Sequence, residues 1–575
     1  MQQEGHGKRR LLVSQQLPDS LVAFLGVLAL LTVLAISAYL RYKNLPTNPS
    51  WEGDEGYNIN MAWNLSHGRL QMYAVSYPFV EHPPLFYALL VPLFWMFGPN
   101  ILALRLLTST FGVLTTLVLY FLGRDTAGQK VGLFAAGVFA IFPVAITYNR
   151  WGYSYNQLMF LGALCAYFTW RYATAHSVEV GPAQAPRANA VRPYINGASE
   201  SEGKSQSQWT SAVRSYASGA LPHRRRPLGW LLAAALTAGL GMASDQEGLF
   251  LIAAVLIVTL ATNRGRLLST AAVAFAVPIM CTTAVLLLMP SEVVYDWQKN
   301  LTRVSDPNAL VAGLTLGINY AGFLGFDYWL VPGIAGIFLM ADKKARTMLV
   351  LFTFVALVFI LKIRNPNPVF RSAIPLLPFV SLGFAVFLVR ATEYLYKWGT
   401  ELWFDAMGDR WHRSRSLAIM SCVFAIIYLP LASILAMDVF SVHGTLRLSN
   451  DDLSPKSLQD AQSMADFVNG STRTDDLVIV SPYVSWLLTA HTTHLSEAVV
   501  AEGKETPFSP ANVPASRFVY DARYNRAKYV VLDDFSRAWA KEMPEEGKIA
   551  REVTTSWPVA FHAGEYVVYQ NPMAK

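Results

Sequence analysis

The chain has 575 residues, of which 53% are hydrophobic and only 15% are charged. A soluble protein of this length is rarely so apolar, so the composition indicates a polytopic membrane protein. The formal net charge is +7, but most basic residues lie in short loops between apolar segments, where they set topology. Nucleic acid is therefore not an expected partner. The three cysteines all fall in apolar segments and form neither a disulfide framework nor a Cys/His metal cluster.

The first apolar segment, Leu21 to Leu40, contains no charge and follows Lys8, Arg9 and Arg10. A cleaved signal peptide is the alternative, because Ala35 to Ser37 loosely resembles a cleavage site. The apolar run is too long for a signal peptide, and many spans follow it. We predict a membrane anchor with a cytoplasmic N-terminus.

Ten later apolar segments predict further spans, at 103–122, 131–148, 157–174, 228–244, 248–262, 267–289, 328–341, 347–362, 372–390 and 416–437. The segment 83–97 is short and is opened by two prolines. If it does not cross, every basic loop falls on the cytoplasmic side. We therefore predict a re-entrant or surface helix at 83–97, about eleven transmembrane helices, and a C-terminus outside.

Two domains are expected. Residues 1–440 form the transmembrane domain, with an outer loop at 41–102 and a disordered cytoplasmic insertion at about 176–227, rich in Ala, Ser, Gly and Pro. Residues 441–575 form a soluble extracytoplasmic α/β domain, with a helix near 458–468, strands at 477–480 and 529–532, and a hairpin at 559–562 and 566–569. No Gly-rich phosphate loop opens its helices, so a nucleotide site is not predicted.

The outer loop carries two adjacent carboxylates, Asp54 and Glu55, between glycines. After them Tyr57, Met61 and Leu65 recur at helical spacing, which predicts a short amphipathic helix along the membrane face. Asp54 then lies at or near the helix N-terminus, where a carboxylate can accept backbone N–H groups. A plain helix cap is the alternative to a chemical role.

The predicted outer loops hold most of the remaining candidate site residues. They are Glu81 and His82 in the first loop, Arg150 and Asn156 in the second, Asp245 and Glu247 in the third, and Lys362, Arg364 and Arg371 at the fifth. Basic residues at span ends more often anchor helices among lipid headgroups. Asp245 and Glu247 are expected to be solvent-facing turn acids, with acceptor binding as the alternative.

Five motifs, in this order, resemble the polytopic GT-C glycosyltransferases. They are GDEGYN (53–58), HPPLFYALL (82–90), ALRLLTSTFGVLTTLVLYFLGR (103–124), the stretch from Pro143 through YNRWGYSYN (148–156), and FRSAIPLLPF (370–379). The chain looks most like the protein O-mannosyltransferase and aminoarabinose-transferase branch (glycosyltransferase families 39 and 83). The likeness covers about the first 390 residues.

The resemblance implies transfer of a sugar from a polyprenyl-phosphate carrier to a hydroxyl acceptor at the outer face, with inversion. It implies that Asp54 activates the acceptor hydroxyl and that Glu55 shapes the catalytic site. Such a reaction needs a base beside the acceptor and positive charge at the leaving phosphate. Arg371, Arg150, Arg364, Lys362 and His82 are the candidate phosphate or carrier ligands, and arginine suits bidentate phosphate binding best. Glu81, Asn156, Asp245 and Glu247 are candidates for acceptor binding or site shaping.

The chain departs from the family pattern at two places. Relatives often carry an acidic residue where this chain has Asn156, which weakens any metal role there. They commonly carry a lysine where this chain reads SDQEG (244–248). No cofactor is predicted, and dependence on a divalent metal is left open.

Two other function classes remain as alternatives. A transporter or flippase would place ionisable residues in the middle of spans, whereas here they collect near one face. A catalytically dead receptor is the third possibility, against which the Asp54–Glu55 pair argues mildly. We favour a multi-pass protein of a bacterial plasma membrane, with a lipid-linked sugar donor and a hydroxyl-bearing acceptor as partners.

Overall fold

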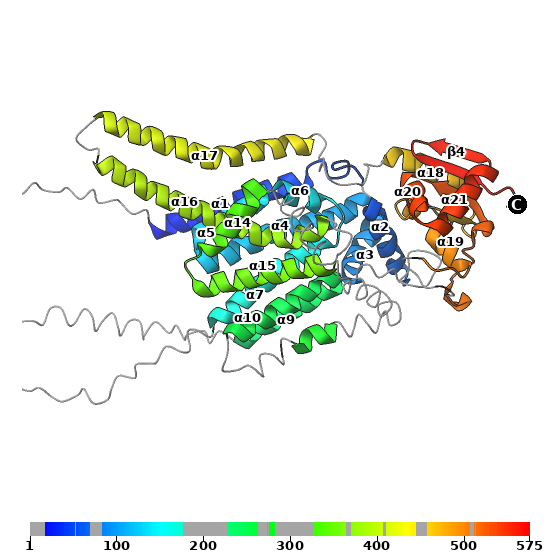
Figure 1. Ribbon diagram of the computed structural model, residues 1–575, viewed down its shortest axis with the longest axis horizontal. Coiled ribbons are helices and arrows are strands. Elements are labelled where there is room, and N and C mark those ends of the chain that lie inside the picture. Colours follow the sequence, from blue (N-terminus) through cyan, green and yellow to red (C-terminus); the bar gives the residue numbers. More distant parts are fainter. Residues whose placement is uncertain are drawn as a thin grey trace, which may run out of the picture.

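The computed structural model describes residues 18–51, 53–69, 83–175, 227–262, 275–281, 326–363, 370–405, 410–443, 457–506 and 513–574, with single residues 273, 322 and 511. They form a helical bundle and a smaller α/β domain at one end of it (Figure 1). The predicted insertion and most of the predicted span 267–289 lie outside the described residues.

The bundle is built from long helices that run roughly along one axis, with shorter ones at the end near the α/β domain (Figure 1). The elements are α1 (Asp19–Tyr42), α2 (Gly53–Ser66), α3 (Leu85–Phe97), α4 (Ile101–Ala127), α5 (Gln129–Ala140), α6 (Pro143–Arg150), α7 (Tyr155–Ala175), α9 (Pro227–Ser244), α10 (Leu249–Thr262), α14 (Val331–Phe338), α15 (Lys343–Ile363), α16 (Leu377–Asp405) and α17 (Arg410–His443). Short 3-10 turns, η2 (Gln246–Gly248) and η5 (Phe370–Leu376), precede α10 and α16.

Several helices have the length and composition of membrane spans. Within the described part of the chain, α1, α4, α16 and α17 qualify, and α5 with α6 makes a fifth if that pair, bent by 59°, is one span. The bend falls at Pro143, which cannot continue the hydrogen-bond ladder of α5. The apolar windows of α1 and α17 are only 11% and 0% buried, so their side chains need lipid around them. The total of eleven crossings stays a prediction.

Helix α3 corresponds to the segment that we expected not to cross. It has 13 residues, with Pro92 inside, and at 1.5 Å per residue it spans about 20 Å, short of the roughly 30 Å hydrocarbon core. One face is buried (Phe86, Leu90, Phe94), while Trp95 and Met96 are exposed. These features agree with a surface or re-entrant helix.

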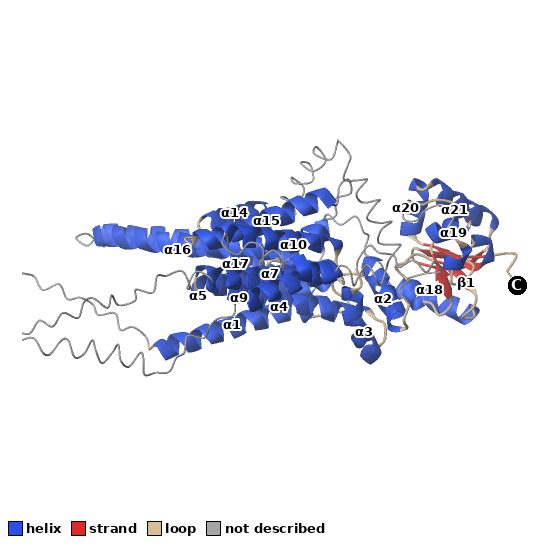
Figure 2. Ribbon diagram, turned by 90° about the horizontal axis from the view of Figure 1, so that it is seen from below, coloured by secondary structure: helices blue, strands red, loops and turns tan. Residues whose placement is uncertain are grey.

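The two ends of the bundle differ as the basic-loop analysis predicted. The start of α1 and the ends of α16 and α17 that are joined along the chain lie at the end opposite the α/β domain (Figures 1 and 2). Helices α2 and α3 lie beside that domain. Which end faces the cytoplasm stays a prediction.

The C-terminal domain holds a five-stranded sheet in the order β2-β1-β3-β5-β4. Strands β1 (Leu477–Ile479), β2 (His491–Thr493) and β3 (Ala527–Leu532) are parallel, while β5 (Tyr566–Gln570) and β4 (Val559–Ala563) form an antiparallel hairpin. In the register Val478 pairs with Thr492 and Tyr529. The predicted helix and strands are present, and β2, only three residues long, was not predicted.

Alternation along the strands separates two apolar layers. Ile479, Val530 and Leu532 face α19 (Leu495–Ala501) and α21 (Pro544–Ser556). Val478, Val531 and Val568 face the opposite way, toward α18 (Leu458–Ser471), and belong to an apolar cluster that continues into α2, α3 and α4. One apolar cluster therefore joins the domain to this end of the bundle, while the rest of the bundle has a core of its own.

Helix α2 departs from its predicted environment. Besides Tyr57 and Met61, the residues Gly53, Glu55, Gly56 and Asn58 to Asn60 are also buried. Its apolar stripe is therefore not the boundary between protein and membrane, because α3 and α4 cover one side and the C-terminal domain covers the other. The predicted short helix is present, but protein packs on both of its sides. Its orientation along the membrane face stays a prediction.

Candidate active site

Asp54 lies in the first turn of α2 and is partly exposed, with 31% of its side chain accessible. Its Oδ2 is 2.5 Å from Nη1 of Arg371, whose side chain is 17% exposed. The Arg371 guanidinium carbon lies 5.2 Å from the centroid of the Tyr153 ring, within the range of a cation–π contact. Asp54, the arginine with which it forms an ion pair, and an aromatic ring thus meet where α2, η5 and the α6–α7 loop converge.

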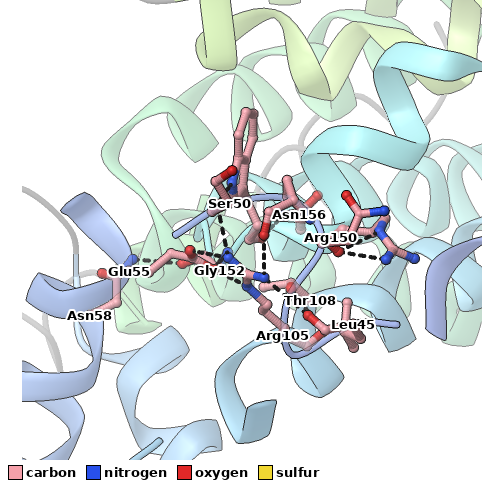
Figure 3. Close-up of polar contacts among 12 residues, drawn as sticks. Leu45, Ser50, Glu55, Asn58, Arg105, Thr108, Arg150, Gly152 and Asn156 are labelled. Atoms are coloured by element: carbon pink, nitrogen blue, oxygen red, sulfur yellow. Dashed lines mark hydrogen bonds and ion pairs between the residues drawn. The ribbon is translucent and has the colours of Figure 1, made fainter. Parts of the chain in front are cut away.

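Glu55, the neighbouring acid, is fully buried and forms a fork-to-fork ion pair with Arg105 of α4 (Figure 3). The Arg105 Nε and Nη2 lie 2.7 Å and 2.6 Å from the two carboxylate oxygens. The Gly152 amide also donates to Glu55 at 3.0 Å. Glu55 therefore ties α2 to α4 and to the α6–α7 loop. This geometry fits the predicted site-shaping role and does not fit a base that touches substrate.

Arg105 also fastens the chain segment that leads into α2. Its Nη1 donates to the carbonyls of Leu45 and Pro49, and its Nη2 to that of Ser50, at 2.8–3.2 Å. The Nε, Nη1 and Nη2 groups of Arg105 thus all donate to oxygen atoms of the protein. Arg105 was not singled out from the sequence, although a charged residue in the first turn of an apolar span is a signal that could have identified it.

Arg150 does not fit the predicted role of carrier-phosphate ligand. Its side chain is fully buried, and its guanidinium donates to the carbonyls of Leu40, Lys43 and Asn48 at 2.5–3.0 Å (Figure 3). A phosphate would have to displace these carbonyls from a buried site. Arg150 instead closes the C-terminal end of α1 against the bundle.

Asn156 shapes the second outer loop. Its Nδ2 donates to the carbonyls of Tyr148, Trp151 and Tyr153 at 2.9–3.2 Å. Its Oδ1 accepts from Asn149 at 2.6 Å, and Asn149 in turn accepts from the buried Arg41 of α1 at 2.8 Å. The amide offers donors and an acceptor at once, which a carboxylate could not do. Arg41 is a further buried residue that sequence reasoning missed.

Asp245 and Glu247 are fully buried, so the expectation of solvent-facing turn acids is wrong. Asp245 accepts from the Ser154 hydroxyl at 3.2 Å and from the Glu247 amide at 2.9 Å. The contact with Ser154 joins the α9–α10 turn to the α6–α7 loop that also carries Tyr153. The turn is buried because it also packs against α9, α10 and α15.

The remaining predicted residues are not placed. Glu81, His82 and Arg364 lie outside the described residues, and so does the side chain of Lys362. Among the residues that are described, no group of three or more His, Cys, Asp or Glu side chains is arranged to hold a metal ion.

Comparison with known proteins agrees with this architecture. Residues 81–181 match the family described as dolichyl-phosphate-mannose-protein mannosyltransferase. The chain superimposes on ArnT from Cupriavidus metallidurans in the apo state with a TM-score of 0.55 at 14% identity, covering 96% of this chain and 98% of that one. The same protein bound to undecaprenyl phosphate gives 0.54 at 14% identity, with 97% and 100% covered.

A second similar structure is the archaeal oligosaccharyltransferase AglB from Archaeoglobus fulgidus, in complex with an inhibitory peptide and a dolichol-phosphate. It matches with a TM-score of 0.54 at 14% identity over 96% of this chain and 75% of that one. The search of curated proteins gave no match. The chain has the fold of the GT-C glycosyltransferases, and it resembles their protein O-mannosyltransferase and aminoarabinose-transferase branch.

Proposed function

We propose that the chain is an inverting glycosyltransferase that moves a monosaccharide from a polyprenyl-phosphate carrier to a hydroxyl acceptor at the outer membrane face. The observation that carries the proposal is the Asp54–Arg371 pair, partly exposed at the end of the bundle that lies beside the C-terminal domain, in a chain with a GT-C fold. The structures that superimpose on this chain include one bound to undecaprenyl phosphate and one bound to a dolichol-phosphate. Their ligands support a lipid-linked donor here.

Asp54 serves as the general base in this proposal. An inverting displacement needs a base that takes the proton of the acceptor hydroxyl as its oxygen attacks the anomeric carbon. Asp54 is suited to this because its carboxylate is accessible, whereas the neighbouring Glu55 is buried. The first turn of α2 surrounds Asp54 with backbone N–H groups, whose dipoles favour a negative charge.

Arg371 binds the phosphate of the donor. The phosphate leaves as an anion and needs no proton, but it needs a cation to hold the charge that develops on it. The Arg371 fork can bind two phosphate oxygens at once. When a phosphate replaces Asp54 as the anion on Arg371, the Asp54 carboxylate is released from this ion pair and can turn to the acceptor hydroxyl. Donor binding thus prepares the base.

Glu55, Arg105 and Arg150 make up the frame that holds Asp54 in place. All three are buried, and they tie the α1–α2 connection and the start of α2 to α4 and to the α6–α7 loop. Geometry of this kind matters because a small displacement of a catalytic group costs a large factor in rate. The contacts described for these three residues are all with groups of the protein itself.

The location of the charged residues disfavours a transporter. Buried charges of the bundle lie near helix ends, with Arg41 one residue before the end of α1 and Arg105 in the first turns of α4. Transporters usually hold their substrates and ions near the bilayer midplane. Chemistry at one membrane face fits this distribution better.

The test uses purified protein in detergent, supplied with a polyprenyl-phosphate sugar and candidate acceptors. We expect a glycosylated product and release of polyprenyl phosphate, both measured by mass spectrometry. A flippase needs two compartments and produces neither in a micelle. In cells, loss of the protein should cause a polyprenyl-phosphate sugar to accumulate, which identifies the sugar. If no lipid-linked sugar accumulates and none is consumed in vitro, the proposal is wrong.

A further inference from the structure

The C-terminal domain contacts α2 beside the acid pair. The contact is made by a loop of residues 481–487 that follows β1, called here the docking loop. A Cβ added at Gly53 would lie 2.0 Å from Cε1 of Tyr483, and one added at Gly56 would lie 1.9 Å from the Tyr483 carbonyl oxygen. One turn further along α2, Asn60 donates to the Ser485 hydroxyl at 3.0 Å in a buried hydrogen bond. The docking loop therefore lies directly against the backbone of α2.

This approach explains why glycines flank the acid pair. Real Cβ atoms essentially never come within 3.0 Å of another heavy atom, so any larger residue at Gly56 would push α2 and the docking loop apart. The partner atom at Gly56 is a backbone carbonyl, which cannot rotate away as a side chain can. Glycine makes a helix less stable than alanine does, and here the contact with the docking loop offsets that cost.

The docking loop is itself fixed from inside its domain. The Ser481 hydroxyl donates to Asp533 at 2.7 Å, and Asp533 also caps α20 (Asp534–Glu542) by accepting from the Ser536 amide at 2.8 Å. The Tyr483 ring packs on Phe535 with 4.5 Å between centroids. Tyr483 is only 4% exposed. The loop thus has a rigid base at the ends of β1 and β3.

The position of this contact in the sheet is informative. In open α/β sheets, ligands bind outside the carboxyl ends of the parallel strands. Here the docking loop follows the carboxyl end of β1, and helix α2 occupies the space beyond it. The C-terminal domain thus uses the carboxyl end of β1 to hold helix α2 of the bundle.

We infer that Tyr483 and the docking loop are positioning elements for Asp54, so that the C-terminal domain is a working part of the transferase site. Asp54 then lies between two fixed points, with the Glu55–Arg105 pair on the bundle side and Tyr483 on the domain side. The inference rests on the proposed function of Asp54 as the base. It predicts that a change in the docking loop slows the chemical step, although the loop does not touch the bonds that are formed and broken in sugar transfer.

The test compares Gly56→Ala and Tyr483→Ala with the parent in the full-length protein in detergent. A displacement of about 1 Å at a catalytic group can cost roughly 100-fold in rate, so we expect kcat to fall by about 10- to 100-fold. The KM for the lipid donor should change little, because Arg371 lies on η5.

The matched control is Gly470→Ala, the same change in α18, where an added Cβ meets nothing within 4 Å. It should leave kcat unchanged. Amide hydrogen exchange of residues 53–66 provides a second measurement, and it should become faster in Gly56→Ala and Tyr483→Ala only. Faster exchange with an unchanged kcat would overturn the positioning role, and unchanged exchange would overturn the docking itself. If the parent transfers no sugar, the proposed function fails, and exchange alone still decides whether the loop holds α2.

Discussion

The buried Glu55–Arg105 pair allows a quantitative test of the frame around Asp54. Replacing Arg105 with methionine removes the positive charge that is paired with the Glu55 carboxylate and leaves that carboxylate buried, beside the Gly152 amide that still donates to it. Breaking a buried ion pair from one side costs about 3–5 kcal/mol, because the remaining charge is left uncompensated. The carbonyls of Leu45 and Pro49 lose the Arg105 donor as well, and the Ser50 carbonyl keeps the hydrogen bond from Trp151. We expect a loss of stability at the upper end of that range.

The double variant Glu55→Gln with Arg105→Met should recover part of the loss, since it leaves no buried charge. The control is Arg390→Met, which removes the same side chain from an ion pair with Glu393 that is 45% and 48% exposed. Exposed pairs contribute about 0–1 kcal/mol. Stability is measured by SDS unfolding and by the apparent melting temperature in detergent. If Arg105→Met and Arg390→Met cost the same, the frame is not built as described.

Three further predictions concern the donor, the topology and pH. Arg371→Ala should weaken use of the lipid donor by about 10- to 150-fold, the equivalent of roughly 1.5–3 kcal/mol for a charged hydrogen bond. Arg371→Lys should reduce donor use by a smaller factor. Equal, full activity in both variants would make Arg371 a helix anchor. A reporter fused after Lys575 should be outside and one inserted at Gly203 inside, and finding both on one side would overturn the predicted topology. Burial lowers the pKa of His494 to about 4, despite the opposing effect of Asp533, so the unfolded chain binds more protons than the native one between that value and the ordinary 6.5. Stability should therefore fall on acidification from pH 6.5 to 4, by on the order of 3 kcal/mol at most, and His494→Asn, which keeps a helix cap, should flatten the slope in the full-length protein.

Periodicity and charge placement predicted most of the fold. Where the structure describes them, the predicted spans are helical, because twenty apolar residues between basic loops admit few other structures. The strands at 477–480 and 529–532 were found because apolar β-branched runs are distinctive. Strand β2, with the sequence His-Thr-Thr, carries no such pattern, because its pairing with β1 determines its conformation.

The candidate site was predicted less completely, because the sequence does not show which charged side chains pair with one another or with backbone carbonyls. The sequence shows that Glu55 and Arg105 are charged, but not that 50 positions apart they form one ion pair. Arg150 looks like a phosphate ligand until its donors are seen to be spent on backbone carbonyls. Asp245 was expected at the surface because turns usually lie there. Only the three-dimensional contacts decide which charges remain available to a substrate.

The most direct test of the central claim is Asp54→Asn, assayed for sugar transfer in membranes supplied with the lipid-linked donor. Asparagine keeps the size of the side chain and most of its capping ability, so the protein should remain folded and still bind donor. It cannot accept the proton of the acceptor, and a general base contributes about 10²–10⁴-fold in rate. We predict a loss of that size, with a milder effect for Glu55→Gln. Transfer at the parental rate by Asp54→Asn would contradict the mechanism.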